Sequence, residues 1–231
     1  MSLFLDRRDA GERLAEALQP LAGRSDVLVL ALPRGGVPVG YEIATRLGLP
    51  LDVLVVRKLG VPGHEELAMG AIASGGALVI NRDVVGPLGI SEAMLQRVIA
   101  RERAELERRE RAFRDDRPPI DVTGKTVLLV DDGLATGSTM LAAVRALRAR
   151  PIAGIMVAVP VAAPDVCEQF RREVDQIVCL ATPEPFYGVG LWYDDFSQTT
   201  DEEVRELLER AAREQPTSAR ATAGASSATT S

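Results

Sequence analysis

The 231-residue sequence has few cysteines, few aromatic residues and no long apolar run. Its two cysteines, Cys167 and Cys179, are too few for a disulfide framework and lack metal-ligand spacing, so we expect reduced thiols in a cytoplasmic protein. Charges, glycine or proline interrupt every apolar stretch before it reaches the ~20 residues of a membrane-spanning helix. The first residues contain no apolar stretch of signal-peptide length, so we do not expect export.

The charge balance gives the chain no general attraction to nucleic acid. It has 27 basic and 33 acidic side chains, a net charge of −6, and aromatics make up only 4%. A basic surface or a set of stacking aromatics would be needed to bind DNA or single strands. The 46% hydrophobic and 26% charged content is typical of a soluble globular protein. We therefore expect neither DNA nor a membrane among its partners.

Short apolar stretches alternate with amphipathic ones along most of the chain. This alternation predicts an α/β fold, with a Rossmann-like, mostly parallel sheet flanked by helices and a small hood or flap region. We expect strands within 26–32, 51–60, 68–81 (two strands joined by Ser74-Gly75-Gly76), 126–131, 152–162 and 176–183. We expect helices at 9–21 (with Asp9 as N-cap), 36–48 (ended by Gly48), 91–114, 139–149, 164–174 and 201–213.

The domain organisation is simple. Residues 1–213 form one expected domain, and a long charged helix is inserted at about 90–115. This helix has only a thin apolar stripe, so one narrow face contacts the body or a partner and the rest is expected to be solvated. Residues 214–231 are rich in Ser, Thr and Ala, which predicts a disordered tail. The apolar stripe consists of Leu95, Val98, Leu106 and Phe113.

The stretch "VLLVDDGLATGST", Val127 to Thr139, carries the strongest chemical pattern. A buried strand ends in Asp131 and Asp132, and a loop of glycines and hydroxyl residues leads into a helix. An acid pair can hold vicinal hydroxyls of a ribose, with or without magnesium, and the helix start suits a phosphate monoester. The blander alternative is that the acids cap the next helix. The combination favours a ribose 5-phosphate site.

Other strand ends are candidates for the same site, because ligands of such sheets bind outside the carboxyl ends of the strands. These ends lie at Pro33–Gly36, Arg57–Lys58 and Pro183–Asp195.

Two stretches resemble known nucleotide-binding motifs but do not match them. "TGKT" before residue 127 lacks the first glycine of a P-loop and precedes its strand, and "LPRGGVPVG" lacks GxGxxG spacing.

With these motifs the chain resembles the type I phosphoribosyltransferases. "VLLVDDGLATGST" is similar to their signature for phosphoribosyl pyrophosphate (PRPP), "LPRGGVPVG" to their pyrophosphate loop, and "FYGVGLWYDDF" to the segment after the last core strand of purine salvage members. The resemblance spans residues 4–210 and includes a subgroup of stand-alone, uncharacterised phosphoribosyltransferase-like proteins. It implies a non-proline cis bond between Arg34 and Gly35.

The resemblance also implies roles for individual residues. The expected catalytic residues are Asp131, Asp132, Lys58 and Arg34. The acid pair would hold the ribose hydroxyls, and Mg²⁺ would be held by Asp131, Asp132 and Asp194, with Asp195 as the alternative to Asp194. The expected PRPP contacts are Asp131, Asp132, Gly133, Ala135, Thr136, Gly137, Ser138, Thr139, Arg34, Gly35, Gly36, Arg57 and Lys58.

The implied reaction transfers the 5-phosphoribosyl group of PRPP to a nitrogenous base and releases pyrophosphate through an oxocarbenium-like transition state. Ala135 stands where hypoxanthine-type members carry an aspartate base, whereas adenine-type members also carry alanine. Phe186, Tyr187, Trp192 and Tyr193 are candidates for stacking on the base, or equally for core and dimer contacts. The alternatives are a non-catalytic PRPP- or nucleotide-binding regulator and, third, an enzyme acting on other phosphorylated sugars. A homodimer is expected.

Overall fold

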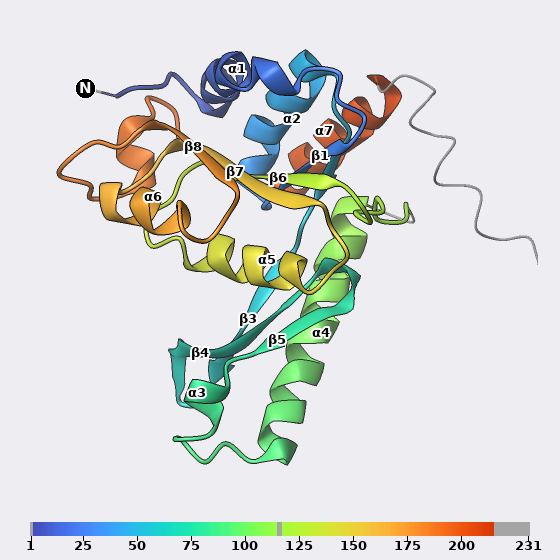
Figure 1. Cartoon of the computed structure of the whole chain (residues 1–231), viewed down its shortest axis with the longest axis vertical. Helices are drawn as coiled ribbons and strands as arrows, with labels where there is room; N and C mark the ends of the chain where they lie inside the picture. The colour runs from blue at the N-terminus through green and yellow to red at the C-terminus, as the bar shows by residue number, and fades with distance from the viewer. Residues whose placement is uncertain (1, 115–116, 215–231) are drawn as a thin grey trace, which may run out of the picture.

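The computed structural model describes residues 2–114 and 117–214, so the expected disordered tail lies, apart from Glu214, outside the described residues. A five-stranded, all-parallel sheet has the strand order β2-β1-β6-β7-β8 (Figure 1). The expected fold class is therefore confirmed. The strands are β1 (Val27–Ala31), β2 (Leu51–Val53), β6 (Thr126–Val130), β7 (Gly154–Val161) and β8 (Gln176–Ala181).

Helices cover both faces of this sheet (Figure 1). Along β6, Leu128 and Val130 pack toward one group of helices, while Val127 and Leu129 pack toward the other. Because both faces are buried, the strands are continuously apolar in sequence. One face carries α1 (Arg7–Ala17), α2 (Gly36–Leu47) and α7 (Asp201–Glu214); the other carries α5 (Ser138–Arg148) and α6 (Pro164–Phe170). Short 3₁₀ turns are η1 (Gln19–Leu21), η2 (Ser74–Gly76) and η3 (Val189–Trp192).

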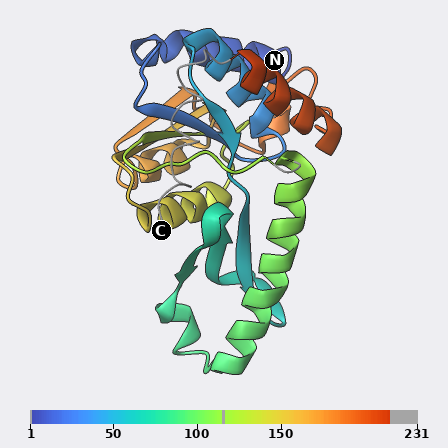
Figure 2. The same ribbon diagram turned by 90° about the vertical axis from the view of Figure 1, so that its right-hand side faces the viewer.

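A second, antiparallel sheet extends away from the parallel one, and the long helix α4 runs along it (Figure 2). We call residues 56–114 the hood. The expected single strand 51–60 is wrong, because the chain changes sheets within it: Leu54 N–H donates to the Ala31 carbonyl at 3.0 Å, whereas Val55 N–H donates to Ser74 Oγ at 2.9 Å. The hood contains β3 (Val56–Val61), β4 (His64–Ala73), β5 (Ala77–Ile80), α3 (Arg82–Val85) and α4 (Glu92–Arg114).

One buried carboxylate joins the two ends of the hood. Asp52, in β2, accepts a hydrogen bond from Arg114 Nε at 2.8 Å and another from the N–H of Ile120 at 3.0 Å. Arg114 is itself buried and also donates to Glu110 at 2.9 Å. The chain therefore leaves the parallel sheet after β2 and returns toward β6 beside the same residue, Asp52.

Helix α4 buries charged as well as apolar side chains. Its expected apolar stripe of Leu95, Val98, Leu106 and Phe113 is buried, which confirms that prediction. Glu102, however, is also buried and binds Arg57 of β3, with Oε2 and Nη2 2.6 Å apart. The expectation that the remaining faces are solvated is therefore wrong at Glu102 and at Arg114, because each has a charged partner inside the protein.

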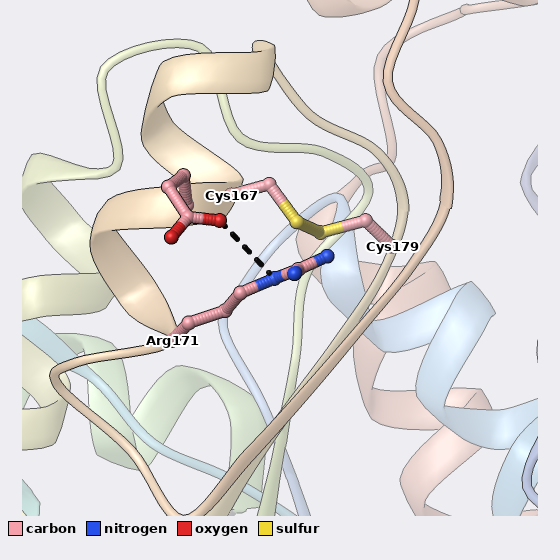
Figure 3. Close-up of a disulfide and its surroundings, with 4 residues drawn as sticks. Cys167, Arg171 and Cys179 are labelled. Carbon is pink, nitrogen blue, oxygen red and sulfur yellow. Dashed lines mark ion pairs between the residues drawn. A yellow bond between two sulfur atoms is a disulfide. The ribbon is translucent and has the colours of Figure 1, made fainter.

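Two local expectations also need correction. The N-cap of α1 is Asp6, whose carboxylate accepts from Asp9 N–H at 2.8 Å, rather than Asp9 itself. Cys167 of α6 and Cys179 of β8 form a disulfide, so they are not the two reduced thiols expected (Figure 3). Helix α6 lies alongside β8, a proximity that the separation of twelve residues did not reveal.

Among the residues described, no helix has the length and apolarity needed to cross a membrane.

Candidate functional site

The adjacent strands β1 and β6 end at a point where the chain diverges. Helix α2, which follows β1, lies on one face of the sheet, and α5, which follows β6, lies on the other (Figure 1). Parallel α/β sheets bind ligands in the crevice that such a divergence opens. Leu32 N–H donates to the Val130 carbonyl at 2.8 Å and holds the two loops together at their base. The expected segments 33–36 and 131–139 therefore meet in one crevice.

The glycines of the first loop lie directly against the acid pair of the second. A Cβ atom on Gly35 would lie 2.0 Å from Oδ2 of Asp132, and one on Gly36 would lie 2.9 Å from Cα of Asp131. Neither position can carry a side chain without displacing a carboxylate or the backbone. The absence of side chains lets the backbone of this loop lie directly against the acid pair.

The two carboxylates have different surroundings. Asp131 Oδ1 accepts a hydrogen bond from the N–H of Asp132 at 2.9 Å, whereas Asp132 is paired with Arg7, whose Nη2 lies 2.8 Å from Oδ2. Burial raises the pKa of Asp131 well above its ordinary value, and the neighbouring Asp132 charge adds to this rise. Burial also raises the pKa of Asp132, although the Arg7 charge opposes the shift. Arg7 thus balances only one of two negative charges.

Arg7 is the main site residue that the sequence did not reveal. It is the first residue of α1, its guanidinium carbon lies 3.9 Å from the centre of the Phe196 ring, and Nη1 donates to the Ser197 carbonyl at 2.7 Å. These contacts hold the Arg7 guanidinium in position beside Asp132. In sequence nothing distinguishes Arg7 from Arg8, which lies on the surface, so no local signal could have found it.

The aromatic segment after β8 supports the acid pair from behind. Tyr193 is buried, and its hydroxyl donates to the backbone carbonyl of Asp132 at 2.6 Å. Burial, with the nearby Asp132 charge, raises the pKa of Tyr193 above its ordinary value, so the phenol keeps its proton. Tyr193 therefore belongs to the core. Phe186 and Trp192 face each other with ring centres 6.4 Å apart, while Tyr187 is 81% exposed.

The loop after the acid pair has an anion-binding shape. Gly137, at φ +65°, starts α5, and a Cβ there would lie 2.6 Å from Phe170, so only glycine fits. Thr136 and Ser138 are exposed beside it, at the positive end of the helix dipole. Lys58 reaches this loop from β3, and its Nζ donates to Ser138 Oγ at 2.6 Å. The hood thus contributes a cation to the crevice.

The remaining residues of this loop differ in their exposure. Gly133 is buried against Val189, whereas Ala135 and Thr139 are exposed next to the other loop residues. Leu134 N–H donates to the Val161 carbonyl at 2.9 Å and anchors the loop beside the end of β7. Exposed hydroxyls and backbone groups on an anchored loop can bind a phosphate without rearrangement.

Several expected site residues have other partners. Arg57 points to Glu102 of α4, because neighbouring residues of a strand face opposite sides and Lys58 faces the loop. Arg34 Nη1 lies 3.6 Å from Asp201, and the pair is exposed. Asp194 accepts from the Ser2 hydroxyl and Asp195 accepts from Ser197 N–H at 2.8 Å. The structure therefore brings neither acid to the Asp131–Asp132 pair.

The expected cis bond is displaced by one residue. The structure has a non-proline cis peptide between Pro33 and Arg34, so its assignment to Arg34–Gly35 is wrong. Within the described residues there is no group of three or more His, Cys, Asp or Glu side chains placed to hold a metal ion. Any cation at the acid pair would therefore take its further ligand oxygens from water or from a bound molecule.

Known proteins share this sequence and fold. The family described as "Phosphoribosyl transferase domain" matches residues 5–178. Proteins of Mycobacterium tuberculosis strains H37Rv and CDC 1551, which bear provisional phosphoribosyl transferase names, are 48% identical over 214 residues; the match covers 93% of this chain and 48% of theirs. The chain thus spans about half the length of these curated relatives. The crystal structure of TT1426 from Thermus thermophilus has a TM-score of 0.81 and 43% identity, over 91% of this chain and 99% of that one.

The fold and the crevice define an α/β protein with a candidate site for a phosphorylated sugar. The comparisons make the class specific, because a family match covers most of the chain. The chain belongs to the phosphoribosyltransferase family and has the type I fold, with an added antiparallel sheet.

Proposed function

We propose that the protein transfers the 5-phosphoribosyl group of PRPP to a nitrogen atom of a base and releases pyrophosphate. The observation that carries the proposal is the hydrogen bond between Lys58 Nζ and Ser138 Oγ, at 2.6 Å. It brings the cation of the hood onto the loop that follows the acid pair. A molecule with a phosphate at one end and a diphosphate at the other can then contact both elements.

Each element of the crevice has a role in this reaction. Asp131 and Asp132 accept hydrogen bonds from the two ribose hydroxyls, and Arg7 orients Asp132. The hydroxyls of Thr136 and Ser138 and the amides at the start of α5 bind the 5-phosphate. As the bond from the anomeric carbon to the diphosphate oxygen breaks, negative charge grows on the leaving group, and Lys58 stabilises it. The base nitrogen bonds to that carbon, and its proton passes to the released diphosphate or to water.

The acid pair fits the Mg²⁺ that this family reaction implies. One of its two charges lacks a cationic partner, since Arg7 pairs with Asp132 alone, and hard carboxylate oxygens suit the ion. Asp131 and Asp132 would hold it together with oxygens of PRPP, and bound Mg²⁺ would neutralise diphosphate charge. Asp194 contacts Ser2 instead, so its expected role requires that segment to move.

The proposal extends to the setting of the protein. An exposed Ala135 offers no proton acceptor to a base, which favours adenine-like acceptors over hypoxanthine or guanine. We place the activity in nucleotide salvage, in the cytoplasm, with a homodimer as the working unit. These features follow from the family resemblance and each has its own test: base specificity, cell fractionation and light scattering of the purified protein.

The decisive experiment incubates the protein with PRPP, Mg²⁺ and a panel of purines and pyrimidines, and measures pyrophosphate release. We expect release with one base and none with the Asp131→Asn, Asp132→Asn double variant. Micromolar PRPP binding without release from any base would contradict the enzyme and favour the non-catalytic regulator. Absence of PRPP binding would contradict both and leave other phosphorylated sugars.

A further inference from the structure

The hood contains a cavity that the crevice does not explain. Its volume is about 440 Å³, within the range of small-molecule sites, and it lies between the β4–β5 turn and the second half of α4. Gly75 and Gly76 form one side, and Ile72, Leu106 and Pro119 provide apolar walls. It is lined by no residue of the loops that follow β1 and β6, so it is a separate space.

Arginines dominate the charge around this cavity. Arg103, Arg111, Arg114 and Arg117 line it, with Glu107 and Glu110 as the acidic residues. Arg114 is balanced by Asp52 and Glu110. The other three arginines have no carboxylate partner within residues 2–114 and 117–214. Among the described residues that line the cavity, four are arginines and two are glutamates.

Arg117 lines the cavity and is incompletely hydrogen-bonded. Its Nε donates to the Arg114 carbonyl and its Nη1 to the Leu208 carbonyl, both at 3.3 Å. Its Nη2 is buried and lacks any hydrogen-bond partner among the described residues. A buried guanidinium nitrogen without an acceptor costs free energy, so the described residues alone leave this arginine incompletely satisfied.

We propose that this cavity binds a small phosphorylated molecule at a second site, distinct from the crevice. Guanidinium groups bind phosphate oxygens in a bidentate manner; among the described lining residues, the three arginines without an ion pair, set against Glu107, leave a surplus of two positive charges, which suits a ligand with two negative charges. The apolar walls suit an organic portion attached to the phosphate, so a nucleoside monophosphate matches the cavity better than an inorganic ion does. The inference concerns binding and does not depend on turnover in the crevice.

The test uses a protein whose crevice has been disabled by Asp131→Asn, Asp132→Asn and Lys58→Met. Isothermal titration with AMP should show one site per chain. Adding Arg103→Gln and Arg111→Gln, two exposed positions, should weaken AMP at least tenfold. The matched control adds Arg97→Gln and Arg108→Gln, which remove the same charge from the same helix outside the cavity, and should leave the affinity within twofold.

A second variant addresses the buried contact. Arg117→Lys keeps the charge but loses the planar guanidinium and its two hydrogen bonds to backbone carbonyls, and we expect weaker AMP binding together with a changed unfolding temperature. Hydrogen exchange with AMP should protect residues 72–76 and 103–111. The proposal is wrong if AMP does not bind, if both arginine pairs weaken it equally, or if citrate binds more tightly than AMP. It is also wrong if the Arg103/Arg111 variant changes only the oligomeric mass, because the cavity would then receive a second copy of the chain.

Discussion

Arg7 and Asp132 are 125 positions apart in the chain, and their side chains meet at 2.8 Å inside the crevice. The contact ties the start of α1 to the end of β6. It also opposes the rise that burial causes in the pKa of Asp132 and fixes the direction of that carboxylate. The proposed binding of the ribose hydroxyls by the acid pair therefore depends on a residue outside the signature stretch.

Arg7→Met should weaken PRPP binding about 10- to 100-fold, as loss of an orienting partner commonly does. It should also lower the free energy of unfolding by about 3 kcal/mol, because a largely buried carboxylate loses its partner. Titration calorimetry and urea unfolding measure the two effects. Arg8→Met, a surface neighbour with 72% of its side chain exposed, is the control and should change neither measurably. Equal effects of both variants would contradict the positioning role.

Asp131→Asn should abolish PRPP binding yet stabilise the protein near pH 7. The pKa of Asp131 is raised by burial and by Asp132, so ionisation is unfavourable in the folded state. Parent stability should therefore fall as pH rises above the ordinary value of 3.8, and the variant should lose this decline. Thermal unfolding with EDTA, from pH 4 to 8, measures it.

Asp132→Asn is the contrasting variant. Its carboxylate has Arg7 as partner, whereas Asp131 has the Asp132 amide and, among the described residues, no guanidinium within ion-pair distance. The pKa of Asp132 is also raised by burial, but the Arg7 charge opposes the rise, so Asp132→Asn should raise the melting temperature at pH 7 less than Asp131→Asn does. If Asp132→Asn gains as much as Asp131→Asn, the charge assignment is wrong.

Gly35→Ala should reduce PRPP affinity at least tenfold while the fold persists. The new Cβ would lie 2.0 Å from Oδ2 of Asp132 and must push that carboxylate away from Arg7. Gly86→Ala is the control, because its nearest neighbour would be 3.2 Å away and the position lies in the hood, far along the chain from the acid pair. Circular dichroism checks folding, and unchanged affinity in Gly35→Ala would contradict the tight contact.

Lys58→Met and Arg57→Met should separate function from structure at adjacent positions. Lys58 contacts the loop at Ser138, so its loss should lower kcat/KM about 10²- to 10³-fold. Arg57 neutralises the buried Glu102, so its loss should instead lower the free energy of unfolding by about 2 kcal/mol. Steady-state kinetics and denaturant unfolding of both variants form the test. A large kinetic loss in Arg57→Met at full stability would restore its expected role at the pyrophosphate.

Removal of the disulfide should destabilise the protein without touching the crevice residues. Cys167 and Cys179 are twelve residues apart, and a cross-link over a loop of that size contributes about 3 kcal/mol. The Cys167→Ser, Cys179→Ser variant should match the parent treated with dithiothreitol in urea unfolding. Identical unfolding of oxidised and reduced parent would show that the cross-link does not contribute.

The parts of the fold that the sequence could predict are those with a local cause. Continuous apolar strands between helices required a covered parallel sheet, and Gly48, at φ +64°, ends α2 as expected. The acid pair and the glycine loop could be placed together because both follow strands whose carboxyl ends share an edge. The resemblance to the phosphoribosyltransferase family was also seen in this stretch, Val127 to Thr139.

The parts that could not be predicted depend on contacts between distant segments. Residues 53–56 are apolar on both sides of the change between sheets, so composition does not mark the break at Leu54–Val55. Arg57 and Lys58 are adjacent cations, and only the pairing of β3 in the hood decides which of them faces the loop. Arg7, Glu102 and the cysteine pair each acquire their role from a partner elsewhere in the chain.

The attachment of the hood has an evolutionary consequence. Because Asp52 binds both the end of α4 and the segment returning to β6, the two ends of the insertion are fastened to the same buried carboxylate. Substitutions, loop changes or even exchange of this module can therefore accumulate without disturbing the sheet beneath it. Related proteins could acquire a different acceptor or different regulation through changes in the hood, while the residues proposed to bind the sugar stay the same.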